Sequence, residues 1–202
     1  MQDYIGEVKS INQDGELNYY PGSPGFARNF LRRQDSAHLY ELHSTDIEYL
    51  TTFCERWKKA RVNQSDGYKG VLGNLPPATR RAVVLIDPPY ELKEDYIKAV
   101  TTIIEGYKRF SSGTYILWYP VVTRNHINGM QQQFLNSKTK NILQVEFNVM
   151  PDTDTYGMTG TGLFIVNPPW QLMEQLHEML PYLNTTLGSK DSSYLLKQLV
   201  EE

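Results

Sequence analysis

The chain has 202 residues, of which 40% are hydrophobic, so it is long enough to fold as one domain around a substantial core. Its formal net charge of -3 argues against a protein coated with basic charge for nucleic acid, although a local basic patch is compatible with it. Charged residues make up 21% of the chain without a block of one sign, which argues against bulk disorder.

The sequence contains one cysteine, Cys54, which can form no internal disulfide and fits a reducing compartment. No apolar run approaches the length of a membrane span, and the first residues lack the basic and apolar regions of a signal peptide. We therefore expect a cytoplasmic protein without a membrane partner.

The first part of the chain alternates helix and strand patterns. Residues 1–12 carry an apolar stripe at helical spacing. Ser23 before Pro24 predicts a second helix, with the hydroxyl as its cap and the proline at its first position. Ala37–His43 predicts a strand, and the turn at 65–67 follows a second, very short one. Between them, Thr45 and Glu48 are spaced as a capping box at a helix start.

The second part repeats the alternation. The expected strands are Val83–Ile86, Thr114–Tyr119, Ile142–Val149 and Leu163–Val166, and the expected helices are Glu94–Phe110, Thr123–Leu135 and Trp170–Leu183. This order favours an α/β fold with a doubly wound sheet. The last two strands have no helix between them, so we expect an antiparallel hairpin at one edge of the sheet. No element is assigned after Gly188.

The stretch VVLIDPPY at residues 83–90 joins a strand to a stiff turn. Its four apolar residues predict a strand that is covered on both faces. Asp87 stands where the strand should end, because Pro88 and Pro89 prevent regular pairing. Ligands of open parallel sheets bind at the carboxyl ends of the strands. The stretch is therefore a candidate site. The same residues could also form a tight turn without any function.

An acid, two prolines and an aromatic residue suit one reaction. The amino group of adenine or cytosine is a poor nucleophile, because its lone pair is delocalised into the ring. Asp87 offers a carboxylate acceptor for its hydrogens, and the carbonyl of Pro88 offers a second acceptor in a turn that cannot rotate away. Tyr90 can stack on an extruded base. Positioning and electrostatics would carry such a reaction.

A second string, Asn167-Pro168-Pro169-Trp170, has the same pattern. We prefer Asp87, because it follows a strand of the parallel part of the sheet. The strand before Asn167 belongs to the expected antiparallel edge, so its end should point to the opposite side. We interpret the second string as a rigid entry into the last helix, with Trp170 packed against that helix.

Other acids follow the preceding expected strands. Glu41 ends its strand, at a position where an acid holds ribose hydroxyls in Rossmann-like domains. Asp66 and Gly67 follow the next strand, where a carboxylate and a closely approaching backbone could hold an adenine. Asp152 and Asp154 are spaced like calcium ligands, but the rest of a calcium loop is absent, so we expect no metal site.

With YYPGSP, LYELH, SDGY and VLIDPPYELKEDY in this order, the sequence resembles the RlmJ-type adenine-N6 methyltransferases, which act on 23S RNA of the large ribosomal subunit. This family was earlier labelled as proteins for the use of external DNA. The resemblance also covers EGYKRF, GTYILWYPVV and NPPW. It implies a Rossmann-like class I fold, S-adenosylmethionine as cofactor and ribosomal RNA as substrate, and no stable protein partner.

The resemblance also assigns roles. It implies that Asp87 engages the target amino group and that Tyr90 stacks on the adenine. It implies that Ser23 contacts the methionine end of the cofactor and Glu41 its ribose. Asp66 with Gly67 would hold the cofactor's adenine.

One part of the family's pattern is not in this sequence. The family has a Tyr/His/Lys-rich beginning and then a strand that ends in an Asp-Thr-His-Ala-Gly cofactor loop. We interpret residues 1–20 as the tail of a helical insertion. Residues 21–202 then form a methyltransferase domain without its first strand and first cofactor loop, which should bind the cofactor poorly.

Two other functions stay open from the sequence. In a metal-dependent nuclease, Asp87, Glu41 and Asp66 would be the ligands, in keeping with the older label for use of external DNA. A nucleic-acid-binding protein without catalysis is the third possibility, because of the missing cofactor loop.

Overall fold

The structure is a computed structural model that describes residues 2–153 and 157–202. The chain divides into two compact units, Met1–Gly70 and Val71–Glu202, which are described one at a time. Among the described residues, we find no helix with the length and apolar character that crossing a membrane requires.

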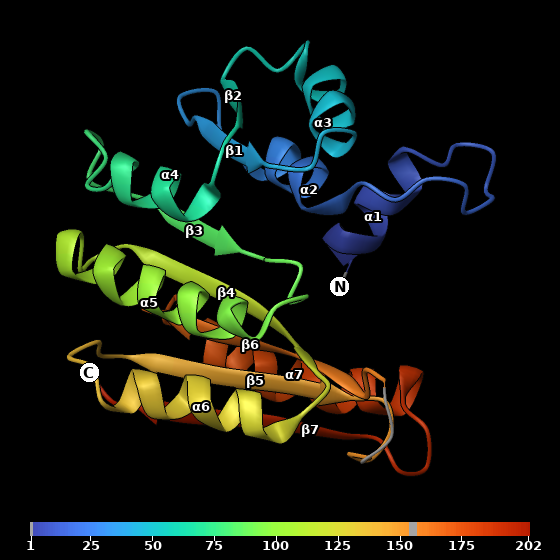
Figure 1. The fold of residues 1–202 in the computed structure, drawn as a ribbon. Helices are drawn as coiled ribbons and strands as arrows, with labels where there is room; N and C mark the ends of the chain where they lie inside the picture. The colour runs from blue at the N-terminus through green and yellow to red at the C-terminus, as the bar shows by residue number, and fades with distance from the viewer. Residues whose placement is uncertain (1, 154–156) are drawn as a thin grey trace. The chain divides into compact units, whose positions relative to one another are not determined.

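The first unit contains a small parallel sheet with helices (Figure 1). Its elements are α1 (Gln2–Ser10), α2 (Gly22–Phe30), β1 (Ala37–Glu41), α3 (Asp46–Cys54), β2 (Ala60–Gln64) and the start of α4 (Gly67–Asn74). β1 and β2 pair in parallel, with Glu41 opposite Gln64, so both strands end at the same edge. The turn between β2 and α4 lies next to the end of β1 because of this register.

Two predicted helix caps are wrong. α2 begins at Gly22, so Ser23 lies inside its first turn and is exposed. Thr45 does precede α3, but its side chain makes no capping hydrogen bond. Its backbone is already helical, with φ -84° and ψ -42°, whereas a capping side chain needs an extended backbone.

The second unit contains a five-stranded sheet in the order β3-β4-β6-β5-β7. Its strands are β3 (Val83–Ile86), β4 (Thr114–Val121), β5 (Ile142–Asn148), β6 (Gly160–Val166) and β7 (Ser193–Val200). Its main helices are α5 (Lys93–Arg109), α6 (Arg124–Leu135) and α7 (Leu172–Leu187). β3 and β4 are parallel, and β6 runs antiparallel to both of its neighbours. β3, β4 and β5 therefore share one direction.

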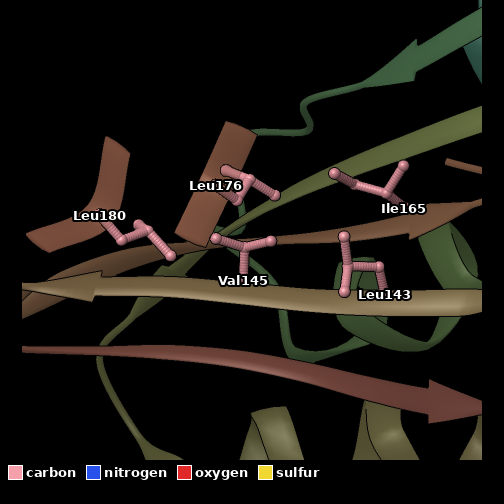
Figure 2. Packing of buried hydrophobic residues seen from close by; sticks show 5 residues of the cluster. All are labelled: Leu143, Val145, Ile165, Leu176 and Leu180. Carbon is pink, nitrogen blue, oxygen red and sulfur yellow. The ribbon is translucent and has the colours of Figure 1, made fainter. Parts of the chain in front are cut away.

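Helices cover both faces of this sheet (Figure 1). On one face, Phe134 of α6 contacts Phe164 of β6, with ring centroids 5.2 Å apart. On the other face, Leu176 and Leu180 of α7 pack on the strands. Figure 2 shows these two leucines with Leu143, Val145 and Ile165, and all five side chains are buried. Successive residues of β6 thus face opposite helix layers, as a central strand of a doubly wound sheet requires.

Two sequence predictions about the strands need correction. β3 is not covered on both faces, because Val83 is 70% exposed and Leu85 is 50% exposed. It is the outer strand of its sheet and pairs with β4 alone in that sheet. The β5–β6 hairpin is antiparallel as predicted, but it does not form the edge, because β7 adds beyond β5.

Gly162 provides a test of the sheet's packing. A Cβ at this position would lie 2.2 Å from Cζ of Tyr119, whose ring is fully buried. We expect Gly162→Ala to lower the free energy of unfolding by roughly 1–3 kcal/mol, because the ring has no space to move. Gly129→Ala is the matched control, since nothing lies within 4 Å of that Cβ, and alanine favours a helix. Equal urea midpoints for both variants would contradict this packing.

Candidate active site

The turn after β3 carries two hydrogen-bond acceptors, the Asp87 carboxylate and the Pro88 carbonyl. Asp87 follows Ile86, the last residue of β3. Among the described residues, neither the Asp87 carboxylate nor the carbonyl of Pro88 has a hydrogen-bond partner. Pro88 is buried, which fixes the turn, whereas Asp87 remains on the surface. Partial loss of water around Asp87 raises the pKa of its carboxyl above the ordinary value.

Tyr90 closes this turn in an unusual backbone conformation. Its φ is 55°, in the left-handed region that is unfavourable for a residue with a bulky side chain. Its hydroxyl donates a hydrogen bond to the carbonyl of Trp118 in β4 over 2.5 Å. Its ring lies 4.5 Å from the ring of Tyr96 and 6.0 Å from that of Trp118. These contacts hold the ring beside the end of β3.

The second string of the same pattern has a structural role. Asn167 follows β6 and lies beside the beginning of β4, because β6 is antiparallel to β4 and pairs Val166 with Tyr115. Its side-chain amide donates to the carbonyls of Ser111 at 2.8 Å and Gly113 at 2.7 Å. In this string the left-handed residue is Asn167, with φ 51°, rather than the aromatic residue.

The two turns thus lie at opposite ends of β4, as the sequence predicts. Trp170 does not pack against the last helix, however, because it is 85% exposed. The predicted packing of Trp170 is therefore wrong.

We expect Asn167→Ala to destabilise the protein by about 1–3 kcal/mol, because two carbonyls lose their donor and alanine is poorly suited to φ 51°. We expect the methyl-transfer activity that the sequence resemblance implies, measured below the unfolding temperature, to equal that of the parent chain. A loss of activity without loss of stability would instead give this turn a part in the reaction.

Glu41, Asp66 and Gly67 come together at one edge of the β1–β2 sheet. Oε1 of Glu41 accepts the backbone N–H groups of Leu42 at 2.7 Å and His43 at 2.8 Å. Oδ1 of Asp66 accepts the N–H of Tyr68 at 2.9 Å, which orders the start of α4. A Cβ on Gly67 would lie 3.2 Å from Cβ of Tyr40, so glycine lets α4 begin close to β1. The sequence predicted that Glu41, Asp66 and Asp87 follow strand ends of one sheet, but Asp87 follows β3, which belongs to the five-stranded sheet.

The Glu41 carboxylate has one oxygen held by the backbone and one available to a ligand. Its Oε1 is held by two backbone N–H groups, while Oε2 has no partner among the described residues. The side chain is half-buried, so Oε2 can accept a hydrogen bond from a ligand hydroxyl in a fixed orientation. Ser23 is exposed at the start of α2, in the same unit.

A buried polar network lies near the carboxyl ends of β4 and β5, and sequence reasoning missed it. Oε1 of Glu146 accepts the Tyr119 hydroxyl at 2.9 Å, and its Oε2 accepts Nη1 of Arg124 at 2.6 Å. Nε2 of Gln144 donates to the Tyr119 oxygen at 2.9 Å. Burial, and then the Glu146 charge, raise the pKa of Tyr119. The alternation of Gln144 and Glu146 with apolar residues is typical of an exposed strand face, but both residues are buried, and Gln131 of α6 donates a hydrogen bond to Gln144.

Arg124 links this network to the loop after β5. Its guanidinium also binds the Asp152 carboxylate, at 2.5 Å and 3.0 Å. These hydrogen bonds with Asp152, and then the contact with Glu146, raise the pKa of Arg124. Asp154, the other acid of the suggested calcium spacing, lies outside the described residues. Among residues 2–153 and 157–202, no three His, Cys, Asp or Glu side chains are grouped to hold a metal ion.

The comparison with known protein families shows to which family the chain belongs. Residues 1–200 match the family described as ribosomal RNA large subunit methyltransferase D, RlmJ. The chain belongs to this family. It is 46% identical over 187 residues to the ribosomal RNA large subunit methyltransferase J of Escherichia coli K12. The aligned residues cover 93% of this chain and 67% of that protein.

Two further relatives support the assignment. The methyltransferase J of Haemophilus influenzae Rd is 46% identical over 185 residues, which cover 91% of this chain and 66% of that protein. The crystal structure of LPL1258 from Legionella pneumophila has a TM-score of 0.91 and 37% identity, over 98% of this chain and 73% of that one. The chain thus spans about two thirds of the length of these curated relatives.

A more distant structure agrees in fold alone. A crystal structure described as a putative rRNA methylase from Clostridium thermocellum has a TM-score of 0.50 at 6% identity, over 72% of this chain and 82% of that one. The α/β methyltransferase fold expected from the sequence is thereby confirmed, including its antiparallel hairpin, although the described strands form two sheets rather than one.

Proposed function

We propose that the chain catalyses transfer of a methyl group from S-adenosylmethionine to N6 of an adenine in 23S ribosomal RNA. Membership of the RlmJ family supports the reaction class and the substrate. The observation that carries the chemical assignment is the pair of acceptors on Asp87 and Pro88 at the end of β3, which have no hydrogen-bond partner within residues 2–153 and 157–202.

The turn suits an exocyclic amino group. Asp87 accepts one hydrogen of the amino group and the Pro88 carbonyl accepts the other. This arrangement favours a tetrahedral nitrogen, whose lone pair is no longer delocalised into the ring. As this nitrogen gained the methyl group, the bond from the methyl carbon to the cofactor's sulfur would break and the sulfur would keep its electron pair. The Asp87 carboxylate would stabilise the positive charge that develops on the nitrogen and would take the proton that leaves. Tyr90 stacks on the face of the extruded base and keeps the nitrogen in place.

The cofactor supplies an electrophilic methyl group, and residues of the first unit would hold it. Glu41 would bind its ribose through the available Oε2, and Asp66 with Gly67 would border its adenine. Ser23 would contact its methionine end. Calorimetry with S-adenosylmethionine tests this part, since Glu41→Ala should weaken binding roughly 10-fold or more when a ribose loses its acceptor.

The reaction is tested with unmodified large-subunit RNA and S-adenosylmethionine that carries a labelled methyl group. The proposal expects label in the RNA, with transfer unaffected by a chelator because no catalytic metal is involved. Cleavage of DNA or RNA that requires a divalent metal, without any methyl transfer, would instead support the nuclease. The family comparison does not favour that alternative.

A further inference from the structure

Tyr90 does not stand alone beside the candidate active site. Its ring packs on Tyr96 of α5, with centroids 4.5 Å apart and planes tilted by 49°. Tyr96 in turn packs on His126 of α6, again at 4.5 Å, with a tilt of 38°. Three rings from the β3 turn, α5 and α6 therefore form a continuous row that runs from the turn into the helix layer.

The middle ring of this row is the most constrained. Tyr96 is 7% exposed and its ring contacts both Tyr90 and His126, so it has little space to rotate. The Nδ1 atom of His126 is buried and has no hydrogen-bond partner among the described residues. His126 thus contributes a packing surface rather than a hydrogen bond through this nitrogen.

Tyr90 depends on such support because its backbone is unfavourable. A φ of 55° is rare for a large side chain and persists where surrounding contacts enforce it. One such contact is the hydrogen bond from the Tyr90 hydroxyl to the Trp118 carbonyl, which fixes the far end of the ring. A second is the contact with the Tyr96 ring, which limits the tilt of the Tyr90 ring.

We propose that Tyr96 is a positioning residue for methyl transfer. Its ring, backed by His126, sets the orientation in which Tyr90 receives the target adenine. The proposal rests on the proposed function, because it assigns Tyr96 to the same site. Tyr96 itself does not touch the base. It acts by keeping Tyr90, and with it the amino group beside Asp87, in the reactive geometry.

The test compares Tyr96→Leu with Tyr115→Leu. Tyr115 is also a buried tyrosine of this unit, and its hydroxyl donates to the main-chain carbonyl of Phe110 at 2.7 Å. It lies near the beginning of β4, away from Asp87. Both variants lose a buried ring, so both should be destabilised, but the proposal expects an effect on catalysis from Tyr96→Leu alone.

Kinetics are measured at a temperature where both variants are folded. We expect Tyr96→Leu to lower kcat roughly 10- to 100-fold with an unchanged KM for S-adenosylmethionine, because the base is misplaced while the cofactor residues are intact. Tyr115→Leu should stay within about twofold of the parent, and Tyr96→Phe should restore activity because the ring face is kept. Equal losses for the two leucine variants would overturn the proposal.

A second measurement does not require turnover. The chain is labelled with fluorotyrosine, and the ¹⁹F signal that disappears in Tyr90→Phe is assigned to Tyr90. Tyr96→Leu should shift or broaden this signal and abolish its response to adenosine monophosphate, whereas Tyr115→Leu should leave both unchanged. An unchanged Tyr90 signal in Tyr96→Leu would overturn the proposal. If the parent chain transfers no methyl group although the ring signals behave as expected, the proposed function fails and the packing role of Tyr96 stands.

Discussion

Asp87→Ala is expected to lower methyl transfer at least about 100-fold, the size of effect seen when a preorganised electrostatic contact to a reacting group is removed. The Asp87 carboxylate has no partner among the described residues, so its removal breaks no hydrogen bond of the fold. Binding of S-adenosylmethionine should be unchanged, because the variant leaves the residues proposed for the cofactor, Glu41, Asp66 and Gly67, unaltered. Initial rates with saturating cofactor, together with calorimetry, separate the two effects.

Asp87→Asn provides the stability control. Desolvation raises the pKa of the folded-state carboxyl, so the folded protein holds this proton more tightly than the unfolded chain does. The ionised group therefore opposes folding above its raised pKa, and this penalty disappears as the pH falls. We expect Asp87→Asn to unfold at a temperature equal to or slightly above that of the parent. An inactive variant that is clearly less stable would contradict a catalytic role.

The same shift predicts how activity depends on pH. Methyl transfer should fall as the pH decreases through the raised pKa of Asp87, because the protonated carboxyl loses acceptor capacity for the amino group.

Arg124→Ala is expected to lower the free energy of unfolding by roughly 3 kcal/mol. Glu146 is 2% exposed, and the variant leaves its carboxylate buried without its cation. Hydrogen bonds from Tyr119 and Gln144 remain, so the loss should lie at the lower end of the range for broken buried ion pairs. Urea unfolding monitored by circular dichroism gives the value.

Asp152→Ala is the matched control, since it removes the exposed partner of the same guanidinium. Asp152 is 48% exposed, so the expected loss is below about 1 kcal/mol. The double variant Arg124→Ala with Glu146→Gln should recover part of the stability, because the unpaired charge is gone. Equal losses in the free energy of unfolding for Arg124→Ala and Asp152→Ala would show that the unpaired buried charge of Glu146 does not cause the destabilisation.

The sequence predicted most elements of the second unit because their hydrophobic periodicity is strong. The helix expected at Glu94–Phe110 is α5 (Lys93–Arg109), and the strand expected at Thr114–Tyr119 is β4. β7 was missed, because Leu195 and Leu196 are adjacent and break the alternation that marks a strand. Its edge position in the sheet leaves its residues mostly half-buried or exposed, so the sequence carries no sharp pattern there.

Some of the geometry of the candidate site could be predicted from the sequence, and some could not. Asp87 and Asn167 were separated by a topological argument, and the antiparallel pairing of β4 with β6 places them as that argument requires. The contact of Tyr90 with Tyr96 was not foreseeable, because it depends on a left-handed backbone that a tyrosine does not adopt by preference. Strand ends can be predicted from local sequence, whereas ring packing between elements needs the tertiary structure.

The central claim is that the Asp87 turn presents the amino group of an adenine for methylation. The most direct test is mass spectrometry of nucleosides from unmodified large-subunit RNA that has been incubated with the chain and S-adenosylmethionine. N6-methyladenosine should appear with the parent chain and with Asn167→Ala, and should be absent with Asp87→Ala. A methylated nucleoside other than N6-methyladenosine, or N6-methyladenosine that forms equally with Asp87→Ala, would contradict the claim.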